Sequence, residues 1–171
     1  TVTRATVGAV RREASNSRWI HLASHAALRD DDPISSSLLL APTDKEDGQL
    51  TISEVLEFDL DADLVVLSAC STGLGRLSGD GVDSFARAFL LAGAKDILVT
   101  LWPVADAVAP FEMERLYGAL ADGRSTNARA LRHAQVETIN ALRRGQLRLP
   151  SGAVLVEHPA LWAPFVLVTG T

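Results

Sequence analysis

The amino-acid sequence predicts an α/β fold, a three-layer sandwich around a mostly parallel sheet. Short runs rich in valine, isoleucine and leucine alternate with longer stretches in which apolar residues recur at helical spacing. Strands that are buried on both faces read as continuous apolar runs, and parallel sheets are covered by helices on both faces. Four such runs are predicted strands, at residues 18–24, 63–69, 95–101 and 163–169.

The segments between these runs carry helix and turn signals. Thr51 and Glu54 have the spacing of a capping box, so we expect a short helix to begin after Thr51. Asp47-Gly48 favours a turn, and we expect a surface hairpin between residues 35–41 and 49–51. Longer helices, each followed closely by a glycine, are predicted at residues 82–91, 107–120 and 127–144.

The beginning of the chain departs from the alternating pattern. Residues 2–14 read as a weak amphipathic helix, and no strand precedes it. An alternating fold ordinarily starts with a strand. We therefore expect a single domain over residues 1–171 that lacks its first strand and is a fragment of a longer protein.

Composition excludes several classes of protein. The net charge is −5 and the 16 basic residues are scattered, so no cationic surface for nucleic acid is expected. No apolar stretch approaches the roughly 18 residues that a membrane-spanning helix needs. The single cysteine cannot form an internal disulfide, and a lone thiol suits a reducing compartment. We expect a soluble cytoplasmic protein.

Two predicted strands end in reactive side chains followed by small residues. His25 follows the first strand and Cys70 follows the second. Ligands of open α/β sheets bind beyond the carboxyl ends of the strands. A thiol becomes a nucleophile as the thiolate, and an imidazole is a suitable base. Neighbouring strands would therefore assemble a dyad for acyl transfer, with backbone amides of Ala26 and Cys70 as an oxyanion hole.

Each of these residues also has a purely structural interpretation. A cysteine at the end of a buried strand is often a small packed hydrophobe, and a histidine there often has only a structural role. Trp102, after the third strand, either walls a cleft or packs in the core. His21 lies on the same strand face as His25, but the extended chain separates the two rings too far for a shared metal ion.

Four blocks of sequence, in the same order, carry a family resemblance. They are HLASHAALRDDDPISSSLLLAP, DGQLTISEVLEFDLDADLVVLSACSTGLG, GDGVDSFARAFLLAGAKDILVTLWPVAD and HPALWAPFVLVTG. They cover about residues 19–106 and 158–170, and they resemble the CHAT family of caspase-like domains, which often occur behind tetratricopeptide repeats. The resemblance implies an endopeptidase without cofactor or metal, whose histidine is His25 and whose nucleophile is Cys70.

The same resemblance suggests residues that bind substrate. Ser68 falls where caspases line the primary specificity pocket, although a buried, hydrogen-bonded serine is an equal alternative. Asp80 is the first choice for an acid that recognises a basic P1 side chain, as in the related gingipains and separases. Most such carboxylates are solvated loop charges. The implied partners are a protein or peptide substrate and tetratricopeptide repeats of the same full-length protein.

Two departures keep other functions open. Ala26 stands where the family usually has glycine, and a positive φ at that position would strain its methyl group. With the missing strand, this favours a catalytically inactive interaction module as the alternative. A nucleotide-binding regulatory domain is a weaker alternative, because Gly73-Leu74-Gly75 lacks the lysine and hydroxyl residue of a phosphate-binding loop.

Overall fold

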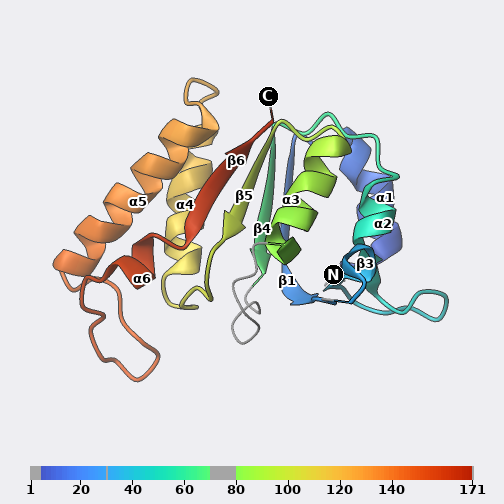
Figure 1. Ribbon diagram of the computed structural model, residues 1–171. Coiled ribbons are helices and arrows are strands. Elements are labelled where there is room, and N and C mark those ends of the chain that lie inside the picture. The colour runs from blue at the N-terminus through green and yellow to red at the C-terminus, as the bar shows by residue number, and fades with distance from the viewer. Residues whose placement is uncertain (1–4, 30, 70–79, 171) are drawn as a thin grey trace. The chain divides into compact units, whose positions relative to one another are not determined.

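The computed structural model describes residues 5–29, 31–69 and 80–170, without the side chains of Ala69 and of residues 80–84 (Figure 1). It consists of two compact units. The first comprises Thr1–Trp102 with Val168–Thr171, and the second comprises Pro103–Leu167. The chain has an α/β fold built on a mixed six-stranded sheet, so the predicted fold class is confirmed.

The strand order in the sheet is β3-β2-β1-β4-β5-β6. The central strands β1, β4 and β5 run parallel, as the apolar runs predicted. β6 crosses the boundary between the units, and Gly170 beyond it donates its N–H to the carbonyl of Lys95 at 2.9 Å within the first unit. The strands are β1 (Trp19–Ala27), β2 (Ser37–Leu39), β3 (Gln49–Thr51), β4 (Leu64–Ala69), β5 (Asp96–Thr100) and β6 (Phe165–Thr169).

The predicted hairpin forms, and it belongs to the main sheet. β2 pairs antiparallel with β3 and also with the last three residues of β1. Gly48 makes the turn possible, because its φ of 81° lies in the left-handed region and a Cβ there would lie 2.5 Å from the carbonyl oxygen of Leu40. Pairing with β2 explains why β1 continues to Ala27 instead of ending at the predicted Ser24.

Three helices lie in the described part of the first unit; α2 and α3 agree closely with the prediction, whereas α1 begins at Val7, five residues after the predicted start. The capping box at Thr51 is confirmed, since its side chain accepts from the N–H of Glu54 while Glu54 accepts from the N–H of Thr51. α3 packs against α2 and β5. Short 3-10 turns lie at Ala14–Asn16 (η1) and Pro33–Ser35 (η2). The helices are α1 (Val7–Glu13), α2 (Ile52–Val55) and α3 (Asp80–Leu91).

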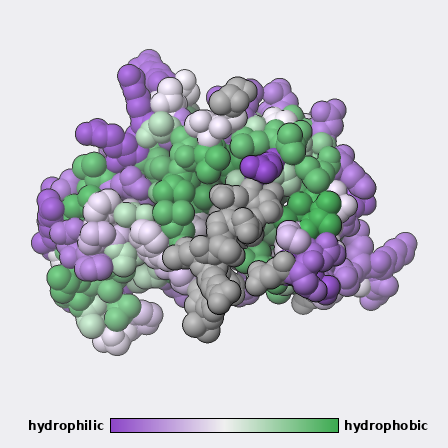
Figure 2. Space-filling model, in the orientation of Figure 1, coloured by the Kyte–Doolittle hydropathy of each residue, from purple (hydrophilic) through white to green (hydrophobic). Residues whose placement is uncertain are grey.

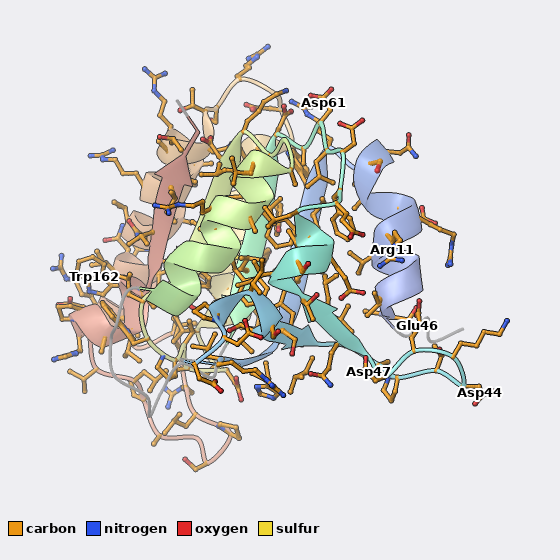
Figure 3. All side chains as sticks on the ribbon, turned by 45° about the vertical axis from the view of Figure 1, so that its right-hand side comes forward. Arg11, Asp44, Glu46, Asp47, Asp61 and Trp162 are labelled. Atoms are coloured by element: carbon orange, nitrogen blue, oxygen red, sulfur yellow. The ribbon has the colours of Figure 1, made fainter. Side chains whose placement is uncertain are left out.

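α1 is attached to the hairpin and to α2 by polar contacts at both of its ends. The carboxylate of Glu46 accepts from the N–H of Gly8 at 3.0 Å, in the first turn of the helix. Arg11 reaches α2 and forms a 3.2 Å ion pair with Glu54. Figure 3 shows Glu46 at one end of α1 and Arg11 along its length. These contacts hold α1 beside the hairpin.

Charged residues join the amino-terminal ends of the three parallel strands. Asp63 precedes β4 and forms ion pairs with Arg18, before β1, and with Lys95, before β5, at 2.7 Å in the second case. Lys95 also contacts Asp61 at 3.4 Å, and Figure 3 shows Asp61 at this end of the unit. Hydrogen bonds from Lys95 and Arg18 lower the pKa of Asp63. The edge of the sheet opposite the predicted site is therefore tied together by charge.

The second unit contains two packed helices and a short third one. Thr126 caps the second helix by accepting from the N–H of Arg129, and the core contains Val108, Ala141, Leu142 and Leu147. Trp162, labelled in Figure 3, donates its indole N–H to Glu157 at 3.0 Å. The helices are α4 (Ala109–Leu120), α5 (Asn127–Arg143) and α6 (Pro159–Trp162).

Glu112 of α4 is a buried carboxyl group without a hydrogen-bond partner among the residues that the structure describes. Its exposure is 0%, and neither side-chain oxygen accepts or donates a hydrogen bond there. Burial raises the pKa of Glu112 to about 8, because a charged carboxylate is poorly solvated in the interior. The folded chain therefore holds this group protonated at neutral pH.

The raised pKa predicts that folding stability falls as pH rises through this range. Above 4.5 the unfolded chain releases the Glu112 proton, while the folded chain keeps it up to about pH 8. Each pKa unit corresponds to about 1.4 kcal/mol, so the free energy of unfolding should drop by a few kcal/mol between about pH 5 and pH 8. Urea unfolding, followed by tryptophan fluorescence at several pH values, measures this slope.

The contribution of Glu112 is the difference between the wild type and Glu112→Gln, which removes the titrating proton and keeps the shape. We expect the variant to show a flatter profile and to gain relative stability toward pH 8. Glu114→Gln, an exposed residue of the same helix, is the matched control and should follow the wild type. Parallel profiles for wild type and Glu112→Gln would contradict the prediction.

Candidate functional site

The carboxyl ends of β1 and β4 lie at the same edge of the sheet. The two strands pair in parallel without a shift, from Trp19 opposite Leu64 to Ser24 opposite Ala69. His25 is the next residue of β1. Cys70 is the next residue in the sequence after Ala69, and it lies outside the described residues. The two predicted dyad residues thus directly follow the last paired residues of neighbouring strands.

The pairing also defines which side chains share a face of the sheet. Residues opposite each other in parallel strands point to the same side, and alternate residues point to opposite sides. Ile20 and Leu22 are buried on one face of β1. His25 lies on the other face, together with Ala23, whose partner in β4 is Ser68. Ser68 and His25 therefore share a face.

His25 is exposed at this edge and is held there by its backbone. Its ring makes no hydrogen bond with any residue in the described ranges. His25 pairs with Leu39 of β2, and the hydroxyl of Ser24 donates to the carbonyl of the same Leu39. The hairpin therefore fixes the strand on which the imidazole stands, while the ring itself stays available to a neighbouring group.

Ala26 has an unstrained backbone. It lies within β1, opposite Leu38, and no described residue other than glycine has a positive φ. The methyl group that replaces the family's glycine therefore carries none of the conformational cost that a left-handed backbone would impose. The antiparallel pairing with β2 sets the direction of the Ala26 amide.

The three predicted substrate-binding residues belong to different segments of the first unit. Ser68 is partly buried near the end of β4, one residue before Ala69. Trp102 is partly buried and comes two residues after the end of β5. Asp80 is the first residue of α3, and its side chain lies outside the described part. Ser68 and Trp102 thus come from neighbouring strands at the carboxyl edge.

His21 is separate from this edge. It lines an open groove of about 340 Å³ between α1 and β1. The walls of the groove remove part of its hydration and lower its pKa. Across residues 5–29, 31–69 and 80–170, no cluster of histidine, cysteine and acidic residues could hold a metal ion. Elsewhere, His158 has a structural contact, because its Nδ1 caps α6 by accepting from the N–H of Ala160 at 3.1 Å.

The hairpin contacts at the site were not evident in the sequence. The Asp47-Gly48 turn indicated a hairpin but not the strand with which it pairs. The bond from Ser24 to Leu39 joins residues that are 15 positions apart, so no local pattern signals it. In the part of the chain that the structure describes, we find no helix with the length and apolar character needed to cross a bilayer.

These features define the class of protein: an α/β domain of the caspase-like type, with a histidine at the carboxyl edge of a parallel strand pair. A family model described as CHAT domain matches residues 1–170, and the chain belongs to this family. The CHAT domain is part of the caspase-like peptidase clan. The family that the sequence blocks resemble is therefore confirmed.

Curated relatives connect the chain with repeat proteins. Tetratricopeptide repeat protein 28 of Mus musculus is 33% identical over 119 residues, which is 70% of this chain and 4% of the relative. The Homo sapiens protein of the same name matches with the same identity and coverage. The chain thus corresponds to a small part of these much longer relatives, and their names are consistent with an association between CHAT domains and tetratricopeptide repeats.

Proposed function

We propose that this chain is a cysteine endopeptidase that hydrolyses peptide bonds with Cys70 as nucleophile and His25 as general base and acid. The observation that carries the proposal is the register of β1 and β4. Because Ser24 pairs with Ala69, the residues that follow them in the chain are His25 and Cys70. Neighbouring strands lie about 4.8 Å apart, a spacing that supports proton exchange between side chains that directly follow the two strands.

The proposed reaction proceeds through an acyl-enzyme. The thiol of Cys70 gives its proton to His25, and the sulfur attacks the peptide carbonyl carbon. The carbon–nitrogen bond then breaks, and His25 protonates the departing amine, which leaves a thioester. Water, deprotonated by His25, attacks the thioester, the carbon–sulfur bond breaks, and the proton returns to the thiolate. The ring of His25, which is exposed and has no hydrogen bond to a described residue, suits these transfers.

Backbone amides of Ala26 and Cys70 are the proposed oxyanion hole. Ala26 lies near the carboxyl end of β1 and Cys70 directly follows β4 in the sequence, so their N–H groups are candidates to converge on one carbonyl oxygen. The unstrained backbone of Ala26 supports this role, because the alanine methyl does not distort the amide. No third residue is needed to orient His25, since its strand is already held by the pairing with β2.

Ser68, Asp80 and Trp102 are the proposed substrate-binding residues. Ser68 shares a sheet face with His25 and lies near the end of β4, two residues before Cys70 in the sequence. Trp102 follows β5, the next strand in the sheet, where an indole can cover an extended peptide. Asp80 begins the helix that leads away from the cysteine segment, and its carboxylate would pair with a basic P1 side chain.

The wider setting of the reaction is part of the same proposal. The reaction uses no cofactor or metal. The partners are a protein or peptide substrate and tetratricopeptide repeats of a longer chain, and the names of the relatives support the second of these. We place the protein in the cytoplasm, where a lone thiol stays reduced. We treat the two compact units as parts of one CHAT domain, because the family match runs across both.

An inactive interaction module is the second candidate. The observation that favours it is the position of Ala26 inside the β1–β2 ladder, opposite Leu38. A ladder residue can have its N–H engaged by the neighbouring strand, and such an amide would not be free for an oxyanion. The reactivity of the single thiol separates the two candidates.

Alkylation of Cys70 should be fast at mildly acidic pH if a dyad exists. An ordinary thiol is almost entirely protonated at pH 6, whereas a thiol beside an imidazole forms thiolate there. We expect His25→Ala to lower the rate of iodoacetamide labelling at pH 6 by roughly tenfold or more. Mass spectrometry reads this directly, because the chain contains one cysteine. His21→Ala is the control, and equal rates in all three proteins would support the inactive module.

Peptide cleavage tests the activity and the proposed P1 preference. We expect the full-length protein to cleave members of a peptide library and Cys70→Ala to cleave none above background. Asp80→Asn should lower kcat/KM for substrates with arginine at P1 by roughly 10- to 100-fold, through loss of a charged hydrogen bond. Asp44→Asn, in the loop between β2 and β3, is the control. Cleavage by Cys70→Ala would remove the peptidase assignment.

A further inference from the structure

An apolar groove lies on the first unit between η2, α2 and α3. Its floor consists of the buried side chains of Ile52 and Ala88. Its walls are three large apolar side chains that are unusually exposed: Ile34 at 50%, Leu56 at 40% and Leu91 at 73%. We call this feature the Arg87 groove, after the charged residue among those that line it.

Arg87 is the one charged residue among the described residues that line the groove. It is exposed, and it makes neither an ion pair nor a hydrogen bond with any residue in the described ranges. The remaining lining residues are apolar, and they include Pro33 of η2. A guanidinium that is surrounded by apolar side chains favours a carboxylate partner, which it can hold through two parallel hydrogen bonds.

The spacing of the groove residues is that of a helix face. Arg87 and Leu91 are four residues apart on α3, so they lie one turn apart on the same side of the helix. Phe85 and Phe89 of α3 are buried, which anchors the helix in the core and fixes the position of its outer face. Figure 2 shows hydrophobic surface over α3 and α2 on this side of the unit.

The size of the groove indicates what fills it. Its volume is about 220 Å³, which is below the roughly 300 to 1,000 Å³ typical of small-molecule pockets. It is suited to a few side chains from a larger partner. Exposed apolar surface with a polar rim is characteristic of protein interaction sites, and arginine beside apolar anchors is a common centre of binding energy.

We propose that the Arg87 groove binds an amphipathic helix that comes from outside this chain. That helix carries a carboxylate one helical turn away from a large apolar side chain. The carboxylate pairs with Arg87, and the apolar side chain packs between Ile34, Leu56 and Leu91. This is the helix-in-groove mode of recognition, with complementary charge setting the register. A second copy of this chain fits less well, because a two-fold pairing through the groove brings two Arg87 side chains together and the described residues that line the groove include no acid.

A display library of helical peptides, selected against the whole protein, tests the proposal. We expect the enriched peptides to carry Asp or Glu one turn from Leu, Ile or Phe. Their affinity, measured by fluorescence anisotropy, should fall at least tenfold for Arg87→Glu and for Leu91→Ser. Leu149→Ser, an equally apolar exposed residue of the second unit, is the matched control and should bind as the wild type does.

Reversing the charge of Arg87 tests directly whether the bound helix carries an acid. A library selected against Arg87→Glu should be enriched in Lys or Arg at the position that was acidic before. Enriched peptides without an acid, or peptides whose binding is unchanged by both Arg87→Glu and Leu91→Ser, would overturn the proposal. Self-association in sedimentation that Leu91→Ser abolishes would also overturn it, in favour of a second copy. Circular dichroism checks that each variant is folded.

Discussion

The unshifted parallel pairing of β1 with β4 is the constraint on which the rest of this structure depends. Six consecutive residue pairs, from Trp19–Leu64 to Ser24–Ala69, place the ends of two distant segments side by side. A shift by one residue would move every side chain of β1 to the other face of the sheet and bury the wrong set. The pairing therefore sets both the core and the neighbours at the carboxyl edge.

Two different kinds of contact secure the two ends of this strand pair. At the amino end, Asp63 joins the entries to β1 and β5 through Arg18 and Lys95. At the carboxyl end, hydrogen bonds join β1 to the hairpin, including the bond from Ser24 to Leu39. Exposed ion pairs tolerate movement, whereas strand pairing fixes direction. The end that carries His25 is thus the one with the more directional restraint.

The remaining features are distributed over separate parts of the molecule. Glu112 of α4 is a buried, uncharged carboxyl group, and Arg87 on the surface of α3 is a cation without an ion-pair partner among the described residues. In both cases a polar group is incompletely paired, which costs free energy. Glu112 avoids the cost of a buried charge by staying protonated, since burial raises its pKa to about 8. For Arg87, a partner with a carboxylate supplies the counter-charge.

The sequence by itself determined the strands, the main helices and the position of His25 at a strand end, because apolar periodicity, the capping box at Thr51 and the turn at Gly48 are local signals. Tertiary structure alone decided that β2 extends β1, that Glu112 is buried and that Ile34, Leu56 and Leu91 share a groove. These features join segments far apart in the chain, and packing, which no local pattern encodes, brings them together.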